Sequence, residues 1–263
     1  MTALSHNRAV ARIRSLCFHV VSALVSLGFV LLYPFILAPR RVVWAILSSW
    51  VAAQVFLLRW VAGIGYRVRG WENLPEGPCI LAARHESMWE TMVLPMRLGN
   101  PTVFLKEEIL RYPIAGPVAR KLGYIGVNRD GDLAAAKRSF DLAKGEVAKG
   151  RRVLIFPSGT RNPAHRTRVQ TGVAVLYRQL KLPCVPIVLN SGDHWLYRSW
   201  LRLPGMIEVE IRPPIPPDLK TREFLDRLSS DLTRPGDQAS TSAAMPSVAS
   251  PSSLGISDRS ERE

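Results

Sequence analysis

Cysteine is scarce in this chain of 263 residues, and its histidines are scattered. The three cysteines are far apart, odd in number and set in apolar runs: Cys17, Cys79 and Cys184. No disulfide framework can be built from this pattern, which indicates small buried side chains in a reducing compartment. The five histidines show no metal-ligand spacing: His6, His19, His85, His165 and His194. We therefore expect no metal site.

Acidic residues are also few, since 35 Lys and Arg face 21 Asp and Glu, a formal net charge of +14. Such a basic balance indicates an anionic partner: nucleic acid, anionic lipid headgroups or a phosphorylated substrate. The alternative is a solvated basic surface without a specific partner. The sequence lacks a module that interleaves aromatic and basic side chains, so we expect no nucleic-acid partner.

Charge is nearly absent from residues 16–38, which follow a polar, basic segment at 1–15. At 1.5 Å rise per residue, this apolar stretch is long enough to cross a bilayer core of about 30 Å. The alternative is a signal peptide. The run is long for one, and it ends at Pro39, Arg40 and Arg41 without a small-residue cleavage site. We therefore predict a membrane-associated helix.

A second apolar stretch, residues 42–60, allows two interpretations. It is either a second spanning helix or a helix that lies in the interface, with its tryptophans at headgroup level. A hairpin would place Arg40 and Arg41 outside, against the positive-inside rule. We expect that one helix spans, or that both enter a single leaflet, with attachment from the cytoplasmic face.

From about residue 65, short apolar runs alternate with amphipathic ones. Strands are predicted at 66–70, 79–83, 103–105, 152–156, 184–189 and 207–211, and helices at 87–98, 132–149 and 171–180. This alternation predicts a layered α/β domain, with a mixed sheet flanked by helices. From 234 the chain is rich in Ser, Ala, Pro and charge, which predicts a disordered tail. The expected division is a basic N-terminus at 1–15, membrane-associated helices at 16–62, the α/β domain at 63–233 and the disordered tail at 234–263.

The most informative segment is the one that follows the strand predicted at 79–83. His85 leaves this strand at its carboxyl end, where open α/β sheets bind ligands, and Glu90 comes five positions later. A carboxylate beside one ring nitrogen would fix the tautomer and leave the other nitrogen free to take a proton. Alternatively, Ser87 and Glu90 form a capping box, and Glu90 serves the backbone of the next helix. The spacing alone leaves both open.

A histidine followed by a carboxylate after four intervening residues resembles the first motif of the glycerolipid acyltransferase family. Three further segments resemble the family's later motifs and follow in its order: 104–116, 123–129 and 155–161, with Val185-Pro186-Ile187 after them as the short fourth motif. The chain departs from the family twice. Glu90 stands where aspartate is usual, and Ser158 stands where glutamate is usual.

The resemblance implies acyl transfer from acyl-CoA or acyl carrier protein to the sn-2 hydroxyl of 1-acyl-sn-glycerol-3-phosphate (lysophosphatidic acid), at the cytoplasmic face of a bacterial inner membrane and without a cofactor. His85 would be the general base, oriented by Glu90, and no serine would be acylated. The phosphate would be bound by Lys106, Arg129 and Arg161, beside a substrate-site loop of Ser158, Gly159 and Thr160.

Backbone N–H groups at the start of the helix after His85 would stabilise the oxyanion. Two alternatives stay open. One is an acyltransferase for another lysolipid acceptor. The other is a non-catalytic membrane lipid-binding relative, which the two departures favour and the presence of His85 disfavours.

Overall fold

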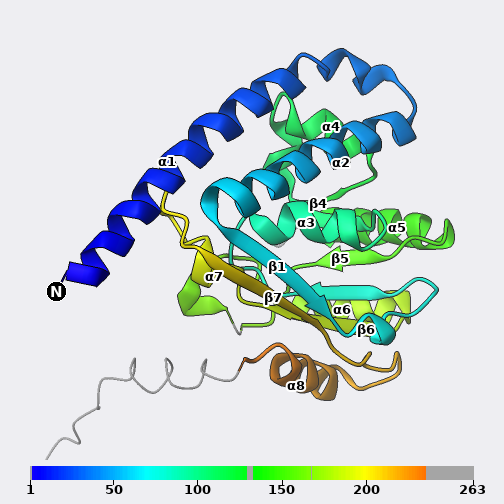
Figure 1. The fold of residues 1–263 in the computed structure, drawn as a ribbon. Coiled ribbons are helices and arrows are strands. Elements are labelled where there is room, and N and C mark those ends of the chain that lie inside the picture. The colour runs from blue at the N-terminus through cyan, green and yellow to red at the C-terminus, as the bar shows by residue number, and fades with distance from the viewer. Residues whose placement is uncertain (1, 129–132, 167, 235–263) are drawn as a thin grey trace, which may run out of the picture. The chain divides into compact units, whose positions relative to one another are not determined.

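The computed structural model describes residues 2–128, 133–166 and 168–234 (Figure 1). Residues 1–233 form one compact unit by their contacts. The tail predicted from 234 onwards lies outside the described residues, apart from Arg234 itself.

A seven-stranded sheet in the order β1-β7-β6-β2-β5-β3-β4 organises this unit. The strands are β1 Ile64–Arg69, β2 Ile80–Ala83, β3 Thr102–Lys106, β4 Ile125–Val127, β5 Val153–Ile155, β6 Cys184–Leu189 and β7 Gly205–Ile211. Only the β6–β7 pair is antiparallel in this sheet, and the other five pairs are parallel. The predicted mixed sheet is confirmed. Because β2 to β6 all run in one direction, their carboxyl ends share one edge of the sheet.

Helices cover both faces of the sheet. They are α3 Trp89–Arg97, α4 Ala115–Lys121, α5 Leu133–Ala148, α6 Thr171–Leu180, α7 Ser191–His194 and α8 Thr221–Asp231, with short 3-10 turns η3 Trp71–Asn73, η4 Glu107–Arg111 and η5 Pro163–His165. In the central strand, Leu81 and Ala83 pack with α3 residues such as Trp89 in one core cluster. Ile80 and Ala82 point the other way, into a second cluster with α5, α6 and α8. A strand buried on both faces reads as a continuous apolar run, as β2 does.

Two long N-terminal helices run back against each other (Figure 1). They are α1 Thr2–Val30 and α2 Arg40–Leu57, joined by a 3-10 turn, η1 Tyr33–Leu37, and α2 continues into a π-helical turn, η2 Leu58–Ala62. The helix α1 begins well before the apolar stretch and includes most of the basic segment 1–15. Residues Arg8–Val30 and Arg40–Ala62 are each long and apolar enough to cross a membrane.

Polar contacts join the two helices to each other and to the domain. Ser22 donates to the Gln54 side chain at 2.6 Å, and Trp50 Nε1 donates to Ser26 at 3.1 Å. On the domain side, the backbone N–H of Arg202 donates to Ser15 Oγ at 2.8 Å. The helical pair is therefore packed on the α/β domain and is not a free extension.

Several element boundaries differ from those predicted. The helix α3 begins at Trp89 and not at residue 87, because Ser87 and its neighbours form the turn that carries His85. Four elements were not predicted: α4, β4, α7 and α8. The strand β4 has only three residues, too few for an alternating pattern to be recognised.

Candidate active site

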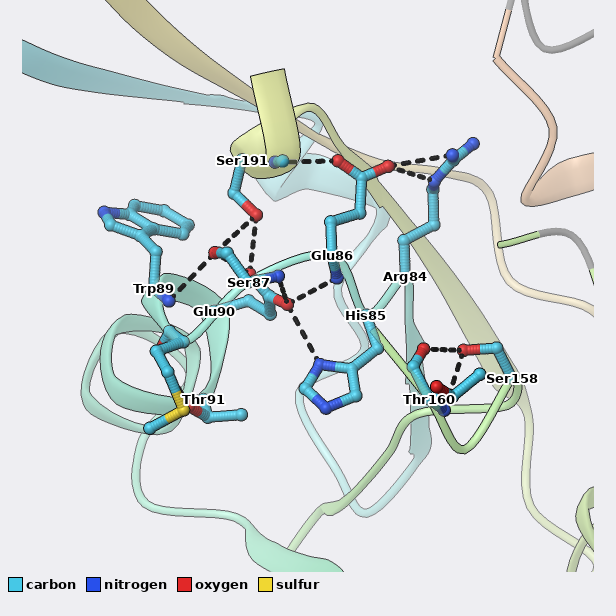
Figure 2. Close-up of polar contacts among 12 residues, drawn as sticks. Arg84, His85, Glu86, Ser87, Trp89, Glu90, Thr91, Ser158, Thr160 and Ser191 are labelled. Carbon is cyan, nitrogen blue, oxygen red and sulfur yellow. Dashed lines mark hydrogen bonds and ion pairs between the residues drawn. The ribbon is translucent and has the colours of Figure 1, made fainter. Parts of the chain in front are cut away.

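A histidine–carboxylate pair lies just beyond the carboxyl end of β2. His85 Nδ1 is 2.9 Å from Glu90 Oε1, with the His85 side chain 15% exposed and that of Glu90 fully buried. A ring nitrogen that faces a carboxylate carries the proton of a neutral imidazole, which leaves Nε2 as its acceptor. Figure 2 shows the second ring nitrogen of His85 pointing away from Glu90. The sequence-predicted pair is brought together.

The Glu90 carboxylate accepts five hydrogen bonds. Besides His85, Oε1 accepts from the backbone N–H groups of Glu86 at 2.6 Å and Ser87 at 2.7 Å. Oε2 accepts from the hydroxyls of Ser87 at 2.8 Å and Ser191 at 2.6 Å. Burial opposes ionisation, but the hydrogen bond and charge of His85, with the bonds from Ser191 and the Ser87 amide, hold the pKa of Glu90 below 4.5. An ionised carboxylate satisfies all five donors.

The two interpretations of Glu90 are therefore compatible. Glu90 accepts the Ser87 amide as the glutamate of a capping box would, and Ser87 Oγ accepts the backbone N–H of Trp89 at 3.0 Å. The first helical residue is Trp89, so this is a turn before the helix and not a standard box. The same carboxylate serves the backbone and the imidazole. The amides of Glu86, Ser87 and Trp89 donate to side chains within the protein, so these three groups are already occupied.

An aromatic ring fixes the plane of the imidazole. Phe156 follows β5, and its ring stacks on His85 with centroids 4.3 Å apart and an interplanar angle of 25°. Phe156 lies within the motif segment 155–161, whose pattern does not predict this contact. The stacking and the bond to Glu90 together restrict both torsions of the His85 side chain.

The loop after β5 carries the departure at Ser158. Ser158 is buried, and its hydroxyl donates to the backbone carbonyl of Thr160 at 2.9 Å. Gly159 has a φ of +65°, in the left-handed region that favours glycine. Figure 2 shows this loop beside His85. Ser158 therefore stabilises the turn, where a glutamate would add a negative charge.

Two of the three predicted phosphate-binding residues, Lys106 and Arg161, lie at the carboxyl ends of β3 and β5, on the same edge of the sheet. Lys106 ends β3, where its Nζ is 2.7 Å from Glu108 Oε1 and its side chain is 54% exposed. Arg161 lies in the loop after β5 and is half-buried, and it forms no ion pair with any carboxylate in the part of the chain that the structure describes. Arg129, two positions after the end of β4, lies outside the described residues.

The residues of this sheet edge lie within a segment that matches a known protein family. A family model described as Acyltransferase matches residues 65–190, which contain the His85–Glu90 turn, the loop after β5 and β6. This domain belongs to the acyltransferase family.

Three relatives of the acyltransferase domain carry the name 1-acyl-sn-glycerol-3-phosphate acyltransferase. The protein of Pseudomonas aeruginosa is 36% identical over 169 residues, 64% of this chain and 66% of that protein. The Borreliella burgdorferi protein is 28% identical (59% of this chain, 64% of that protein), and the human alpha protein is 27% identical (65% and 62%). The chain thus matches no more than about two thirds of the length of each of these relatives.

The fold also has a solved counterpart. The crystal structure of the 1-acyl-sn-glycerophosphate (LPA) acyltransferase PlsC from Thermotoga maritima has a TM-score of 0.65 and 19% identity to this chain. The match covers 92% of this chain and 99% of that one. The similarity therefore includes the N-terminal helical pair as well as the acyltransferase domain.

A short helix that was not predicted, α7 Ser191–His194, completes the site. The four-residue helix α7 follows β6 directly, and Ser191 and Gly192 at its start are buried. Gly192 N donates to Glu86 Oε2 at 3.0 Å, and Glu86 Oε1 pairs with buried Arg84 at 2.8 Å. The sequence feature that could have identified it is the polar run Asn190-Ser191-Gly192 directly after the buried strand β6. His85 was identified by the same kind of position, at the carboxyl end of a buried strand.

Neither a reactive thiol at Cys79 nor a three-ligand metal cluster is found in the part of the chain that the structure describes. Burial raises the pKa of the Cys79 thiol to about 11, so this thiol is protonated at neutral pH. Across residues 2–128, 133–166 and 168–234, no group of three or more His, Cys, Asp or Glu could hold a metal ion.

Proposed function

We propose that this chain is a 1-acyl-sn-glycerol-3-phosphate O-acyltransferase, which transfers a fatty acyl group to the sn-2 hydroxyl of lysophosphatidic acid and forms phosphatidic acid. One observation carries the proposal: at the carboxyl edge of an acyltransferase-family sheet, His85 Nδ1 lies 2.9 Å from a buried carboxylate, and no residue that the structure describes bonds the second ring nitrogen. The names of the relatives support the choice of acceptor.

The reaction is a direct transfer. The free Nε2 of His85 takes the proton of the acceptor hydroxyl while its oxygen attacks the thioester carbonyl of acyl-CoA or acyl carrier protein. A C–O bond forms, the C–S bond breaks, and the departing thiolate takes the proton from the imidazolium. Glu90 orients His85 and stabilises the imidazolium. Ser87 is not acylated, because its hydroxyl is buried and donates to Glu90.

The acceptor's phosphate is bound by Arg161, Lys106 and Arg129. Arginine suits this task because its fork donates two parallel hydrogen bonds to phosphate oxygens. The absence of an ion-pair partner for Arg161 in the described residues leaves its guanidinium available, whereas Lys106 would have to leave Glu108. Ser158 favours a second candidate, an acceptor with a different headgroup, because the turn lacks the negative charge that is usual in the family.

The acyl chains are accommodated by the helical pair. An apolar cavity of about 450 Å³ lies between α1, η1 and α2 on one side and η4 and α4 on the other. Its lining includes Phe29, Leu47, Trp50, Ile109 and Val118. Both helices also expose large apolar side chains, such as Leu24 on α1 and Phe56 on α2. We propose that the pair attaches the enzyme to the cytoplasmic face of a bacterial inner membrane, from which its amphiphilic substrate reaches the site.

The test is acyl transfer by the purified protein in detergent, with labelled acyl-CoA and, separately, acyl carrier protein as donor. The acceptors are lysophosphatidic acid, glycerol-3-phosphate and lysolipids with larger headgroups. Preferred transfer to lysophosphatidic acid supports the proposal. Preferred transfer to another lysolipid replaces the acceptor and keeps the mechanism. Folded protein that transfers to none of these acceptors would overturn the assignment in favour of a lipid-binding relative.

A further inference from the structure

The start of α7 contacts both acidic side chains of the His85 turn. Ser191 Oγ donates to Glu90 Oε2 at 2.6 Å, and Gly192 N donates to Glu86 Oε2 at 3.0 Å (Figure 2). The two segments are 101 positions apart in the sequence, and the parallel pairing of β2 with β6 brings their carboxyl ends together. Ser191 is completely buried. This hydroxyl therefore has no solvent to satisfy it and depends on partners inside the site.

The hydroxyls of Ser87 and Ser191 act on the same carboxylate oxygen. Each is within 2.8 Å of Glu90 Oε2, and their oxygens are 2.8 Å apart. Ser87 Oγ also accepts from the Trp89 amide. Because Oε2 is held from the side opposite His85, the carboxylate cannot rotate without breaking these bonds. The other oxygen of the Glu90 carboxylate, Oε1, then stays within hydrogen-bond distance of His85 Nδ1.

Because Glu90 is longer than aspartate, its carboxylate needs the contacts of Oε2 with the Ser87 and Ser191 hydroxyls as well as those of Oε1. A glutamate has one more rotatable bond than an aspartate, so its carboxylate has more freedom to lose when it is fixed beside a histidine. The three donors on Oε1 lie on the local turn, and Ser191 is the donor that comes from another element. It therefore ties the carboxylate to the sheet edge.

We infer that Ser191 is a positioning residue for acyl transfer, which holds the Glu90 carboxylate in the orientation that fixes the His85 tautomer. This inference rests on the proposed function. Ser191 touches neither the reacting oxygen nor the thioester, and acts through Glu90 alone. Its removal should leave α7 in place, because Gly192 N still binds Glu86 and Trp195 N still donates to the carbonyl of residue 191 at 2.8 Å.

The experiment is a double-mutant cycle on acyl transfer from acyl-CoA to lysophosphatidic acid. We expect Ser191→Ala to lower kcat by about tenfold to a hundredfold, the range of one hydrogen bond to a charged group, with KM for both substrates within about twofold of wild type. In a Glu90→Gln background the same substitution should cost little more. The three donors on Oε1 select the amide oxygen there, so the NH2 group takes the place of Oε2 and cannot accept the Ser191 hydrogen bond. The control is Ser139→Ala, which removes another buried serine hydroxyl, bonded to Gly126 O at 2.8 Å, away from Glu90.

Ser191→Cys serves as a second variant, because it keeps the volume and offers only a weak donor. If Ser191→Ala does not fold, the Cys variant must show the same fall in kcat and the same lack of additivity. Additive losses in the Glu90→Gln background, or a kcat for either folded variant equal to that of Ser139→Ala, would overturn the inference. Inactive wild-type protein would instead contradict the proposed function, so the two failures are distinguishable.

Discussion

Shortening Glu90 to aspartate tests whether the site is built for the longer side chain. The carboxylate accepts five hydrogen bonds of 2.6 to 2.9 Å, three on Oε1 and two on Oε2. Glu90→Asp withdraws it by about 1.5 Å, the length of one C–C bond. Because N–H···O bonds extend only to about 3.2 Å, the shorter carboxylate cannot keep both sets of partners.

The magnitude follows from the bonds that are lost. A hydrogen bond to a charged group contributes about 1.5–3 kcal/mol, so the loss of one that orients His85 lowers kcat by about tenfold to 150-fold. Steady-state kinetics with acyl-CoA and lysophosphatidic acid, with thermal unfolding as a check on folding, measures this effect. The control Glu90→Gln keeps the length and removes the charge, and should cost about 10³–10⁴-fold, as in a triad whose acid is neutralised. Wild-type kcat in Glu90→Asp would refute the argument from side-chain length.

Three further predictions concern the surroundings of the site and the fold. Phe156→Ala removes the ring stacked on the imidazole, and should lower kcat by about threefold to tenfold, equivalent to the 0.5–1.5 kcal/mol of a ring pair, with KM unchanged; an unchanged kcat would contradict a positioning role. Gly70→Ala should lower the free energy of unfolding by at least about 2 kcal/mol, because φ of Gly70 is +80° and the new Cβ would overlap the Ile211 carbonyl oxygen. The control Gly77→Ala has open space around the new Cβ and should be nearly neutral in the same thermal melts. The pKa of Glu90 in the folded protein lies below its ordinary value of 4.5, so the ionised carboxylate stabilises the fold above about pH 4.5. This stabilisation is lost as pH falls through the lowered pKa, so the difference in unfolding temperature between wild type and Glu90→Gln should shrink in acid. A difference that stays constant down to pH 2 would be the contrary result.

The sequence predicted the elements that have strong local signals. The helix α6 Thr171–Leu180 and the strand β6 Cys184–Leu189 match the predicted bounds because a turn separates an amphipathic run from a buried one. The helix α8 was missed, although Phe224 and Leu228, four residues apart, are its fully buried positions. Two apolar side chains in an otherwise polar segment gave too weak a periodicity to be recognised.

The site was predictable only where its contacts are local. The spacing of His85 and Glu90 allowed their contact to be foreseen, because the turn between them is short. The contributions of Phe156 and Ser191 depend on which strands are neighbours in the sheet, and strand order is not contained in local spacing. The partner of Lys106 is Glu108, two positions away, and only coordinates distinguish this ion pair from a free cation at the site.

The proposed acyl transfer depends most on His85 as the general base. The most direct measurement is the rate of acyl transfer to lysophosphatidic acid by His85→Ala, beside His165→Ala as a control that removes an exposed histidine from the turn η5. The account predicts a loss of about 10²–10⁴-fold in kcat for His85→Ala and nearly normal turnover for His165→Ala, with both proteins folded. Near-normal turnover in His85→Ala would contradict the central claim and require another group to take the proton of the acceptor hydroxyl.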